Sequence, residues 1–415
     1  MRATFILVFP SLITVLMAFT GVAHASATVL SGTQQEQVVT LIASPQPYVI
    51  RGDYYVPAGK QLVIEAAASF VAEKDASLSV SGTLLVNGMK EKPVEFRGKA
   101  TGRSYWKGIK LQEGTGELNF VHISGAKTAC FARDSRVTLR GCVLTKNSAG
   151  IDADRTAYVI EDCLISENER SGVYVASGPA EDRSSITSCT ITGNGGWGLD
   201  TGWGTKLIVQ HTIISGNREG GIRLTSGMVD GEITVGSSTI VNNGKRDVLN
   251  ESEKDFGFSG NWWGDPATKL LISKGDTANL PNILDGHDEE GKGKVRVHDF
   301  LRERPKDCGA FASEAGKQGS GAGPATVGQG MSVTFSRDCY LIAKSEDYYP
   351  FHVALANGDT AEVQQYVSDG RVFQIGSGTK GLAVTAQGSA YGIRVLDGPN
   401  KGKQGWVYSK NVKTE

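Results

Sequence analysis

The sequence has little proline, no excess of one charge and no long apolar segment beyond its first residues. Its 415 residues include 12 Pro but 53 Gly, and 43 Lys and Arg balance 44 Asp and Glu to a net charge of −1. A chain so close to neutral has no long-range field that attracts nucleic acid or an anionic membrane, so no nucleic acid is expected as a partner. Beyond residue 27 no segment reaches the ~20 apolar residues of a spanning helix, so no transmembrane segment is expected in the mature chain. Abundant Gly with scarce Pro is typical of many short strands joined by tight turns.

The spacings of a metal site are also missing. The six Cys contain no CxxC pair, and the six His contain no HxH or HExxH motif. A zinc site is therefore not expected.

Residues 1–27 have the features of a secretory signal peptide. Arg2 gives a positive n-region, FILVFPSLITVLMAF is an apolar h-region, and Ala25-Ser26-Ala27 is a small-x-small cleavage site. An N-terminal membrane anchor is the alternative, and the small residues at the end of the segment argue against it. We expect export to the periplasm or the extracellular space, where disulfides can form.

One phrase recurs along the first two thirds of the chain. CVLTKNSAGIDA, CLISENERSGVYV and CTITGNGGWGLDT begin at Cys142, Cys163 and Cys189. An apolar residue stands three positions before each Cys and another two after it, and an Asn follows five after it. Thr212 and Ser238 continue this frame and Asn119 opens it, which gives six passes at intervals of 21 to 26 residues. A period of this length indicates a repeat architecture.

The pattern inside each pass is that of short strands. Apolar and polar residues alternate over four or five positions, as in a strand with one buried face. No window keeps the i, i+3, i+4, i+7 spacing of a helical repeat, and the Leu-x-x-Leu-x-Leu pattern of leucine-rich repeats is absent. A coil of about three short strands per turn remains, so the sequence predicts an all-β chain built mainly as a parallel β-helix.

Stacked coils should align equivalent residues in columns ~4.8 Å apart. One column would contain Asn147, Asn168, Asn194, Asn217 and Asn243. Asn tolerates left-handed backbone at a turn and can pass amide hydrogen bonds along such a column. The corner glycines that follow (Gly150, Gly172, Gly198 and Gly221) are expected to adopt positive φ. Cys142, Cys163 and Cys189 are interpreted as small buried residues, with one disulfide among neighbouring columns as the alternative.

Several stretches of residues 45–302 resemble secreted bacterial right-handed parallel β-helix proteins of the pectate-lyase-like architecture. VPAGK resembles their entry turn, SYWKGIKL their W-x-G-I coil, GNWWGDP their closing coil and GKVRVHDFLRERP their exit strand. The resemblance implies a right-handed β-helix, which we place at residues 28–304. It implies no activity, because this architecture hosts lyases, hydrolases, epimerases, adhesins and non-catalytic proteins. The catalytic motifs of polygalacturonases and pectate lyases are absent, so no catalytic residue can be transferred.

The composition changes at the end of the β-helix. Residues 305–330 are rich in Gly, Ala and Ser, which predicts a flexible linker. Cys308 and Cys339 bracket it, and a disulfide between them is one expectation for an exported chain. Residues 331–415 predict a small domain with one short helix, near residues 360–367, and four strands separated by Gly turns. Residues 370–413 resemble a bacterial SH3-like barrel through Gly402, Lys403, Gly405, Trp406 and Val407, and such modules commonly bind peptidoglycan or a protein partner.

The repeat frame also places charged side chains on one face. Counting from each corner glycine, the next residue should point inward and the one after it outward. The outward column is then Asp152, Tyr174, Asp200 and Arg223. Asp154 should lie two residues further along its strand beside Arg133, and Trp197 and Trp203 flank Asp200, where aromatic rings can stack on sugars. The candidate ligand face comprises Asp152, Asp154, Tyr174, Trp197, Asp200, Trp203 and Arg223.

This face has three interpretations. It is an ordinary solvated strand face if Asp200 and Arg223 only form a cross-strand ion pair of ~0.2–1 kcal/mol. Asp152 and Asp200, two coils or ~9–10 Å apart, have the separation of an inverting glycosidase. Alternatively, Asp152 and Asp154 hold Ca²⁺ while Arg223 abstracts a proton from a uronic acid, as in pectate lyases. Catalytic candidates are therefore Asp152, Asp200 and Arg223.

Together these features predict an exported, non-catalytic envelope or extracellular binding protein that needs no cofactor. Its β-helix would present a site for polysaccharide or protein, and its SH3-like domain would tether it to peptidoglycan or to an envelope protein. One alternative is a polysaccharide lyase or glycoside hydrolase acting on an extended acidic glycan. The other is an adhesin or spacer that binds nothing on this face.

Overall fold

A computed structural model of the chain describes residues 27–179, 182–275, 278–306, 308–310, 332–344, 347, 351, 360–387, 390–408 and 411–414. Almost all of the predicted signal peptide and most of the predicted linker lie outside these residues. Within the described part of the chain, no helix is long and apolar enough to cross a membrane.

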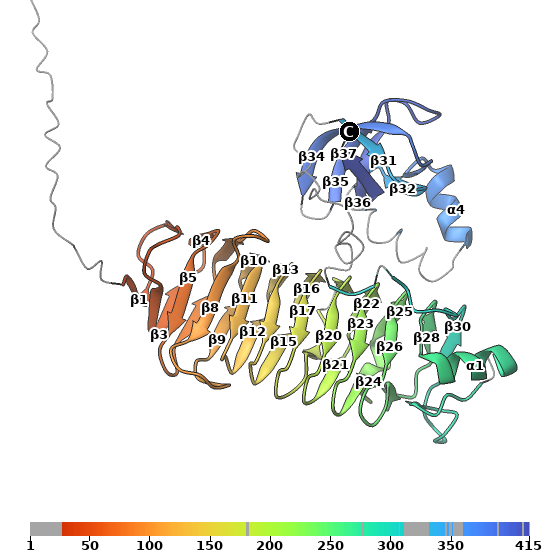
Figure 1. Cartoon of the computed structure of the whole chain (residues 1–415), viewed down its shortest axis with the longest axis horizontal. Coiled ribbons are helices and arrows are strands. Elements are labelled where there is room, and N and C mark those ends of the chain that lie inside the picture. Colours follow the sequence, from red (N-terminus) through yellow and green to blue (C-terminus); the bar gives the residue numbers. More distant parts are fainter. Residues whose placement is uncertain are drawn as a thin grey trace, which may run out of the picture.

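The predicted repeat is a parallel β-helix, in which every coil adds one strand to each of three parallel ladders (Figure 1). The long-strand ladder contains β6 (Ser77–Val80), β9 (Gly108–Gln112), β12 (Thr128–Arg133), β15 (Ala149–Asp154), β18 (Val173–Ser177), β21 (Trp197–Trp203), β24 (Gly220–Leu224), β27 (Val248–Asn250) and β29 (Ile283–Leu284). The short-strand ladder contains β5 (Ser69–Ala72), β8 (Val94–Gly98), β11 (Val121–Ser124), β14 (Val143–Thr145), β17 (Leu164–Ser166), β20 (Thr190–Thr192), β23 (Ile213–Ser215) and β26 (Thr239–Val241).

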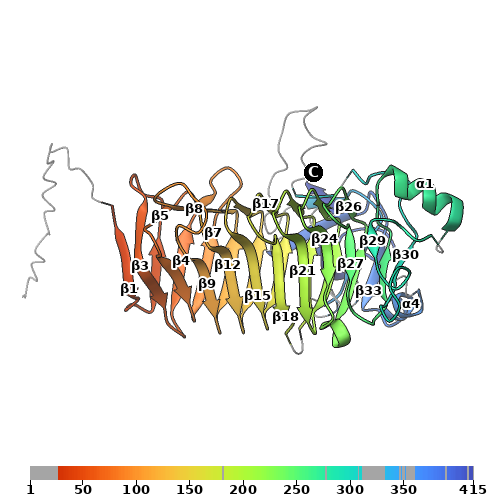
Figure 2. The same cartoon turned by 90° about the horizontal axis from the view of Figure 1, so that it is seen from below.

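The third ladder is a separate nine-stranded sheet. It contains β2 (Val38–Leu41), β4 (Gln61–Glu65), β7 (Thr83–Asn87), β10 (Thr115–Asn119), β13 (Arg136–Arg140), β16 (Ala157–Glu161), β19 (Ser184–Thr187), β22 (Lys206–Gln210) and β25 (Glu232–Gly236). The stack begins with β1 (Val29–Thr33) on β3 (Tyr48–Val56), and β3 then pairs with both β5 and β6. Figure 2 shows the long-strand ladder as strands side by side along the whole β-helix.

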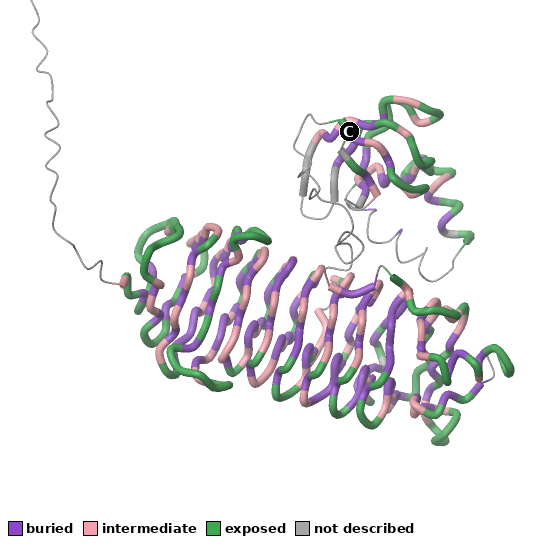
Figure 3. Tube along the Cα trace, viewed as in Figure 1, coloured by how far each residue is buried: buried purple, intermediate pink, exposed green. Residues whose placement is uncertain are grey.

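Alternation along each strand fills the inside of the coils. Ile160, Ile165 and Ile191, which the repeat frame places inward, are fully buried, and buried and exposed segments alternate along the coils (Figure 3). Near the N-terminal end the interior is aromatic, since the rings of Phe70 and Phe96 stack 4.4 Å apart. Each fully buried apolar side chain of this size contributes about 1.5–3 kcal/mol, so the continuous core is what stabilises the stack.

The asparagine column forms as predicted. Nδ2 of Asn168 donates to Oδ1 of Asn194 at 3.0 Å, and Nδ2 of Asn194 donates to Oδ1 of Asn217 at 2.9 Å. Each amide also bonds the backbone, as when the main-chain N–H of Asn168 donates to Oδ1 of Asn194 at 3.2 Å. The column ends on Asp247, whose Oδ1 accepts from Nδ2 of Asn243 at 2.8 Å. Burial raises the pKa of this terminal carboxyl, and the amide donors oppose that rise.

The predicted backbone of these turns was wrong. None of Gly150, Gly172, Gly198 and Gly221 has positive φ; the left-handed residue instead precedes each Asn, as at Lys146 with φ 58° and Glu167 with φ 54°. The corner glycines are required by space. A Cβ on Gly150 would lie 2.3 Å from the carbonyl oxygen of Gly172, and one on Gly221 would lie 2.4 Å from that of Asp247.

None of the six cysteines forms a disulfide in the structure. Cys142, Cys163 and Cys189 are buried and in line with Thr212, confirming the small-residue interpretation; the backbone N–H of Cys142 donates to Sγ of Cys163 at 3.3 Å. The expected disulfide between Cys308 and Cys339 is not formed. Cys308 is buried beside the β-helix, where the next residue, Gly309, donates its N–H to the carbonyl of His211 at 2.7 Å. Cys339 begins a strand of the C-terminal sheet, so the two thiols belong to different cores.

The last coils are closed by elements that the repeat frame does not contain. The 3₁₀ turn η1 (Met228–Asp230) follows β24, and the helix α1 (Asp265–Lys274) begins with the last two residues of the GNWWGDP stretch. Gly264 and Pro266 mark the start of α1 in the sequence, since Pro is favoured in the first helical turn. Beyond it, β30 (Val295–His298) pairs in parallel with β28 (Phe256–Ser259), where the resemblance placed an exit strand.

The C-terminal part is a seven-stranded antiparallel sheet with a core of its own, centred on Val333, Phe335 and Ile393. It contains β31 (Ser332–Phe335), β32 (Cys339–Ile342), β33 (Val372–Ile375), β34 (Lys380–Gln387), β35 (Ala390–Val395), β36 (Gln404–Tyr408) and β37 (Val412–Thr414). β33 to β36 are the four predicted strands, and α4 (Thr360–Ser368) is the predicted helix. The sequence analysis missed β31, β32 and β37, each only three or four residues long.

Candidate functional site

The predicted outward column is present on the long-strand ladder. Asp152 of β15 pairs with Tyr174 of β18, Tyr174 with Asp200 of β21, and Asp200 with Arg223 of β24. Neighbours in this column are therefore one strand spacing apart, and Asp152 and Asp200 are separated by roughly 9.5 Å between their Cα atoms. We call these four residues, together with Trp203 at the end of β21, the column face.

Asp200 is the most unusual group of the column face. It is 9% exposed, its buried Oδ1 has no hydrogen-bond partner among the described residues, and the nearest cation, Nη1 of Arg223, is 3.9 Å away. Burial raises the pKa of Asp200 to about 6; the charge of Arg223 opposes the rise, and Glu251 and Glu219 add to it. This carboxyl can take up or release a proton near neutral pH, which is the property that a general acid or base requires.

Arg223 makes its closest ion pair with a residue that the sequence analysis missed. Its Nε lies 3.0 Å and its Nη2 2.9 Å from Oε2 of Glu251. Glu251 immediately follows β27, on the next coil. Because Glu251 holds the guanidinium, the expected ion pair between Asp200 and Arg223 is loose. The repeat frame gave no signal for Glu251, which lies beyond the last strand position of its coil.

Asp154 is engaged by cations of its own. Its Oδ2 accepts from Nε of Arg133 at 3.0 Å, the predicted neighbour, and from Nη1 of Arg155 at 3.1 Å; the hydroxyl of Ser177 donates to Oδ1. The two guanidinium groups occupy Oδ2 of Asp154, so a Ca²⁺ ion shared by Asp152 and Asp154 would have to compete with them for this carboxylate. No group of three His, Cys, Asp or Glu side chains suited to a metal ion occurs in the part of the chain that the structure describes. Asp152 itself is half-buried, and burial raises its pKa while Arg170 opposes the rise.

The three aromatic residues of the predicted face differ in their exposure. Tyr174 is 40% and Trp203 69% exposed, whereas Trp197 is only 8% exposed. A Cβ on Gly220 would lie 2.0 Å from the ring of Trp197, so this indole packs on the backbone of the next coil. Tyr174 and Trp203 remain as rings that a ligand can reach.

The column also extends further toward the N-terminus than the sequence analysis placed it. Asp152 pairs with Phe131 of β12, and Phe131 pairs with Lys110 of β9. The corner rule applied to Gly108 would have found Lys110. Phe131 was missed because Ala129 occupies the corner position in its coil.

The comparison with protein families agrees with this fold. The family model described as "right handed beta helix region" matches residues 107–262, and the parallel ladders of this part of the chain form a right-handed β-helix. A mutant of the periplasmic alginate epimerase AlgG is a similar solved structure, with 11% sequence identity, a TM-score of 0.33, and 65% of this chain and 84% of that chain covered. No curated protein sequence matches the chain.

Proposed function

We propose that the chain is an exported protein that binds an extended glycan along the column face and is tethered by its C-terminal domain. The observation that carries this proposal is the setting of Trp203. The ring is 69% exposed, yet a Cβ on Gly227 would lie 2.9–3.0 Å from three atoms of its five-membered ring. A point almost equally distant from three atoms around a ring lies above its face, so the indole rests with one face on the Gly227 backbone.

An indole supported on one face offers its other face to a ligand. Such a flat, apolar surface suits the C–H face of a sugar ring, and its low conformational freedom limits the entropy lost on binding. Tyr174 offers a second ring one coil away, and Asp152, Asp200 and Arg223 supply hydrogen-bonding groups between and beside the rings. The column runs along the β-helix, so its repeat suits an elongated ligand.

The tethering role is proposed for the C-terminal sheet. Its β35–β36 turn contains Gly402 and Lys403, and β36 contains Gly405, Trp406 and Val407. These are the residues that resemble bacterial SH3-like domains. The sheet has its own hydrophobic core, which supports an independent binding module. Retention of the mature protein on purified peptidoglycan, lost on deletion of residues 331–415, is the expected result; retention that persists without this region would contradict the tether.

The glycan site is tested by titrating the mature protein with neutral and acidic oligosaccharides and measuring binding by calorimetry, a signal that does not depend on Trp203 itself. Trp203→Ala should weaken binding about tenfold, or ~1.4 kcal/mol. Gly227→Ala should weaken it as well, because the added methyl pushes the indole off its support.

Gly257→Ala is the matched control, since a Cβ there meets no atom within 4 Å. Binding that is unchanged by both Trp203→Ala and Gly227→Ala would refute the column face as the glycan site.

A second candidate function is favoured by Asp200. A buried carboxyl with a pKa of about 6 and an unpaired oxygen is suited to proton transfer in a polysaccharide lyase or glycoside hydrolase. New ultraviolet absorbance from unsaturated uronates, or new reducing ends, that Asp200→Asn abolishes would establish the enzyme. Absence of turnover on polyuronates and neutral glycans would leave the binding function alone.

A further inference from the structure

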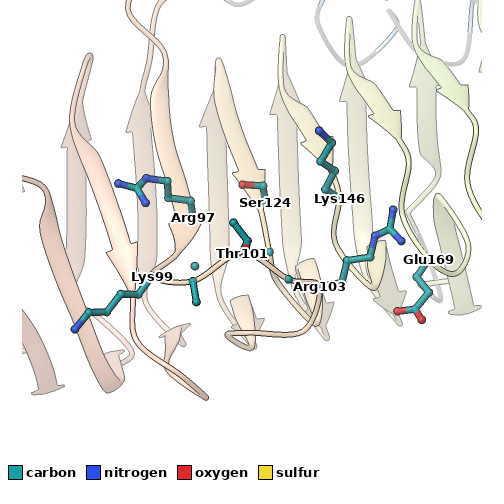
Figure 4. Close-up of a pocket in the computed structure, with 11 residues that line it drawn as sticks. Arg97, Lys99, Thr101, Arg103, Ser124, Lys146 and Glu169 are labelled. Atoms are coloured by element: carbon teal, nitrogen blue, oxygen red, sulfur yellow. The ribbon is translucent and has the colours of Figure 1, made fainter.

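A cleft of about 730 Å³ lies away from the column face. The connection between β8 and β9, residues 99–107, folds over the corner between the short-strand and long-strand ladders and forms one wall (Figure 4). The other wall comes from the same corner of three successive coils, through Ser124 of β11, Lys146 after β14 and Glu169 after β17. Lys110 and Phe131 of the long-strand ladder do not line it.

The charge of this cleft differs from that of the whole chain. Arg97, Lys99, Arg103 and Lys146 line it with a single carboxylate, Glu169, so its side chains carry a net charge of +3 (four cations and one anion). Arg97 and Lys146 are exposed, and no carboxylate among the described residues pairs with either. Figure 4 shows Ser124 between Arg97 and Lys146. Lys99 has a carboxylate partner outside the lining, since its Nζ lies 3.7 Å from Oε1 of Glu73. Arg97 and Lys146 are therefore the cations through which this cleft would attract an anion.

The wall formed by residues 99–107 is held in place without a ligand. The N–H of Tyr105 donates to the carbonyl of Gly125 at 2.8 Å, and Nε1 of the fully buried Trp106 donates to the carbonyl of Ser124 at 2.9 Å. Arg103 reaches across the coils, where its Nη2 donates to the carbonyl of Glu167 at 2.9 Å. A preformed site loses little entropy on binding.

The spacing of the cations indicates the shape of the ligand. Arg97 pairs with Ser124 in the short-strand ladder, and Lys146 directly follows the next strand of that ladder. The Cα atoms of Arg97 and Lys146 are therefore two strand spacings, or roughly 9.5 Å, apart. The hydroxyls of Thr101 and Ser124 also line the cleft, and such mixed cationic and hydroxyl linings match a ligand with both acidic and hydroxyl groups.

We propose that this cleft is a second glycan site, specific for acidic oligosaccharides bearing carboxylate or sulfate groups. It binds independently of the column face, since none of its lining residues belongs to that face. Guanidinium and ammonium groups bind the oxyanions, and the hydroxyls bind the sugar between them.

The test measures binding of the mature full-length chain by calorimetry. The probes are a uronate oligosaccharide, a sulfated oligosaccharide, a neutral oligosaccharide of equal length and a single-stranded oligonucleotide. The Arg97→Gln and Lys146→Gln double variant should bind the acidic probes at least about tenfold more weakly, since two charge-assisted contacts are lost. Binding by the unaltered protein should also weaken as salt is added.

The matched control is the double variant Arg218→Gln and Lys245→Gln, which removes the same charge from the same corner several coils away. This control should bind the acidic probes as the unaltered protein does. The Arg97 and Lys146 variant should bind the neutral probe as the unaltered protein does, which separates this site from the column face. Preference for either the uronate or the sulfated probe supports the proposal and identifies the acidic group. The proposal would be overturned if the Arg97 and Lys146 variant bound the acidic probes as tightly as the unaltered protein, if it lost as much affinity for the neutral probe, or if the unaltered protein bound the oligonucleotide more tightly than the acidic probes.

Discussion

Removing the charge of Asp200 should stabilise the protein at neutral pH. The pKa of this carboxyl is about 6 in the folded protein against an ordinary value of 3.8, chiefly because of burial. The folded state therefore binds more protons than the unfolded state between these two pH values, so the contribution of Asp200 to stability falls as the pH rises from about 4 to about 6. At 1.36 kcal/mol for each pH unit, the loss reaches roughly 3 kcal/mol above pH 6.

Asp200→Asn keeps the shape of the protonated carboxyl without its titration. The variant should be more stable than the unaltered protein by up to about 3 kcal/mol at about pH 7.5, and equal to it at about pH 4. Urea unfolding followed by circular dichroism at both pH values measures this difference. Because Asp152 and Asp247 are unchanged in both proteins, their own titrations cancel in the comparison.

Asp255 provides a control of opposite sign. The backbone N–H of Lys294 and the guanidinium of Arg296 lower the pKa of its carboxyl, so Asp255→Asn should destabilise the protein at neutral pH. The reasoning about Asp200 is refuted if Asp200→Asn is no more stable than the unaltered protein at about pH 7.5, or if its effect is the same at both pH values. Either result would mean that Arg223 keeps Asp200 ionised.

Three further predictions concern the stack of coils. Asn194→Ala should cost about 3 kcal/mol in urea unfolding, because it leaves buried amide groups on both neighbouring coils unpaired, whereas the exposed Asn87→Ala should cost less than about 1 kcal/mol. Gly108→Ala should prevent accumulation of soluble folded protein, since its φ is 100° and a Cβ would lie 1.7 Å from the carbonyl oxygen of Thr128. The thiols of Cys142 and Cys163 should resist a thiol reagent at pH 8 in the native protein, because burial raises their pKa values well above 9.0; in denaturant without reductant, all six thiols should titrate.

The repeat could be predicted from the sequence because each coil has the same short pattern of apolar, Asn and corner positions. Alternation around Cys142, Cys163 and Cys189 assigned the inward residues correctly, and the spacing of the asparagines placed their amides in one column. Even the order of Asp152, Tyr174, Asp200 and Arg223 followed, because parallel stacking in register turns a constant offset in sequence into a constant position in space.

Features without a counterpart in the repeat were missed or misassigned. The corner glycines were assigned a positive φ. They are required instead because a Cβ would clash with the next coil, and this clash is visible only once the coils are packed. The expected disulfide between Cys308 and Cys339 is not present in the structure, where Cys308 lies against the β-helix and Cys339 begins a strand of the C-terminal sheet. The helix α1 occurs only once, so the repeat period could not predict it.

The sequence by itself determined the β-helix and the residues that face outward, because both depend on a pattern repeated at short range. Tertiary structure alone decided the chemistry of those residues. The protonation of Asp200 depends on burial by neighbouring coils, the partner of Arg223 comes from beyond the repeat, and the basic cleft arises where one long connection folds over three coils. The burial of a side chain and the electrostatic potential around it depend on residues that are distant in the chain. A local sequence pattern therefore cannot predict them.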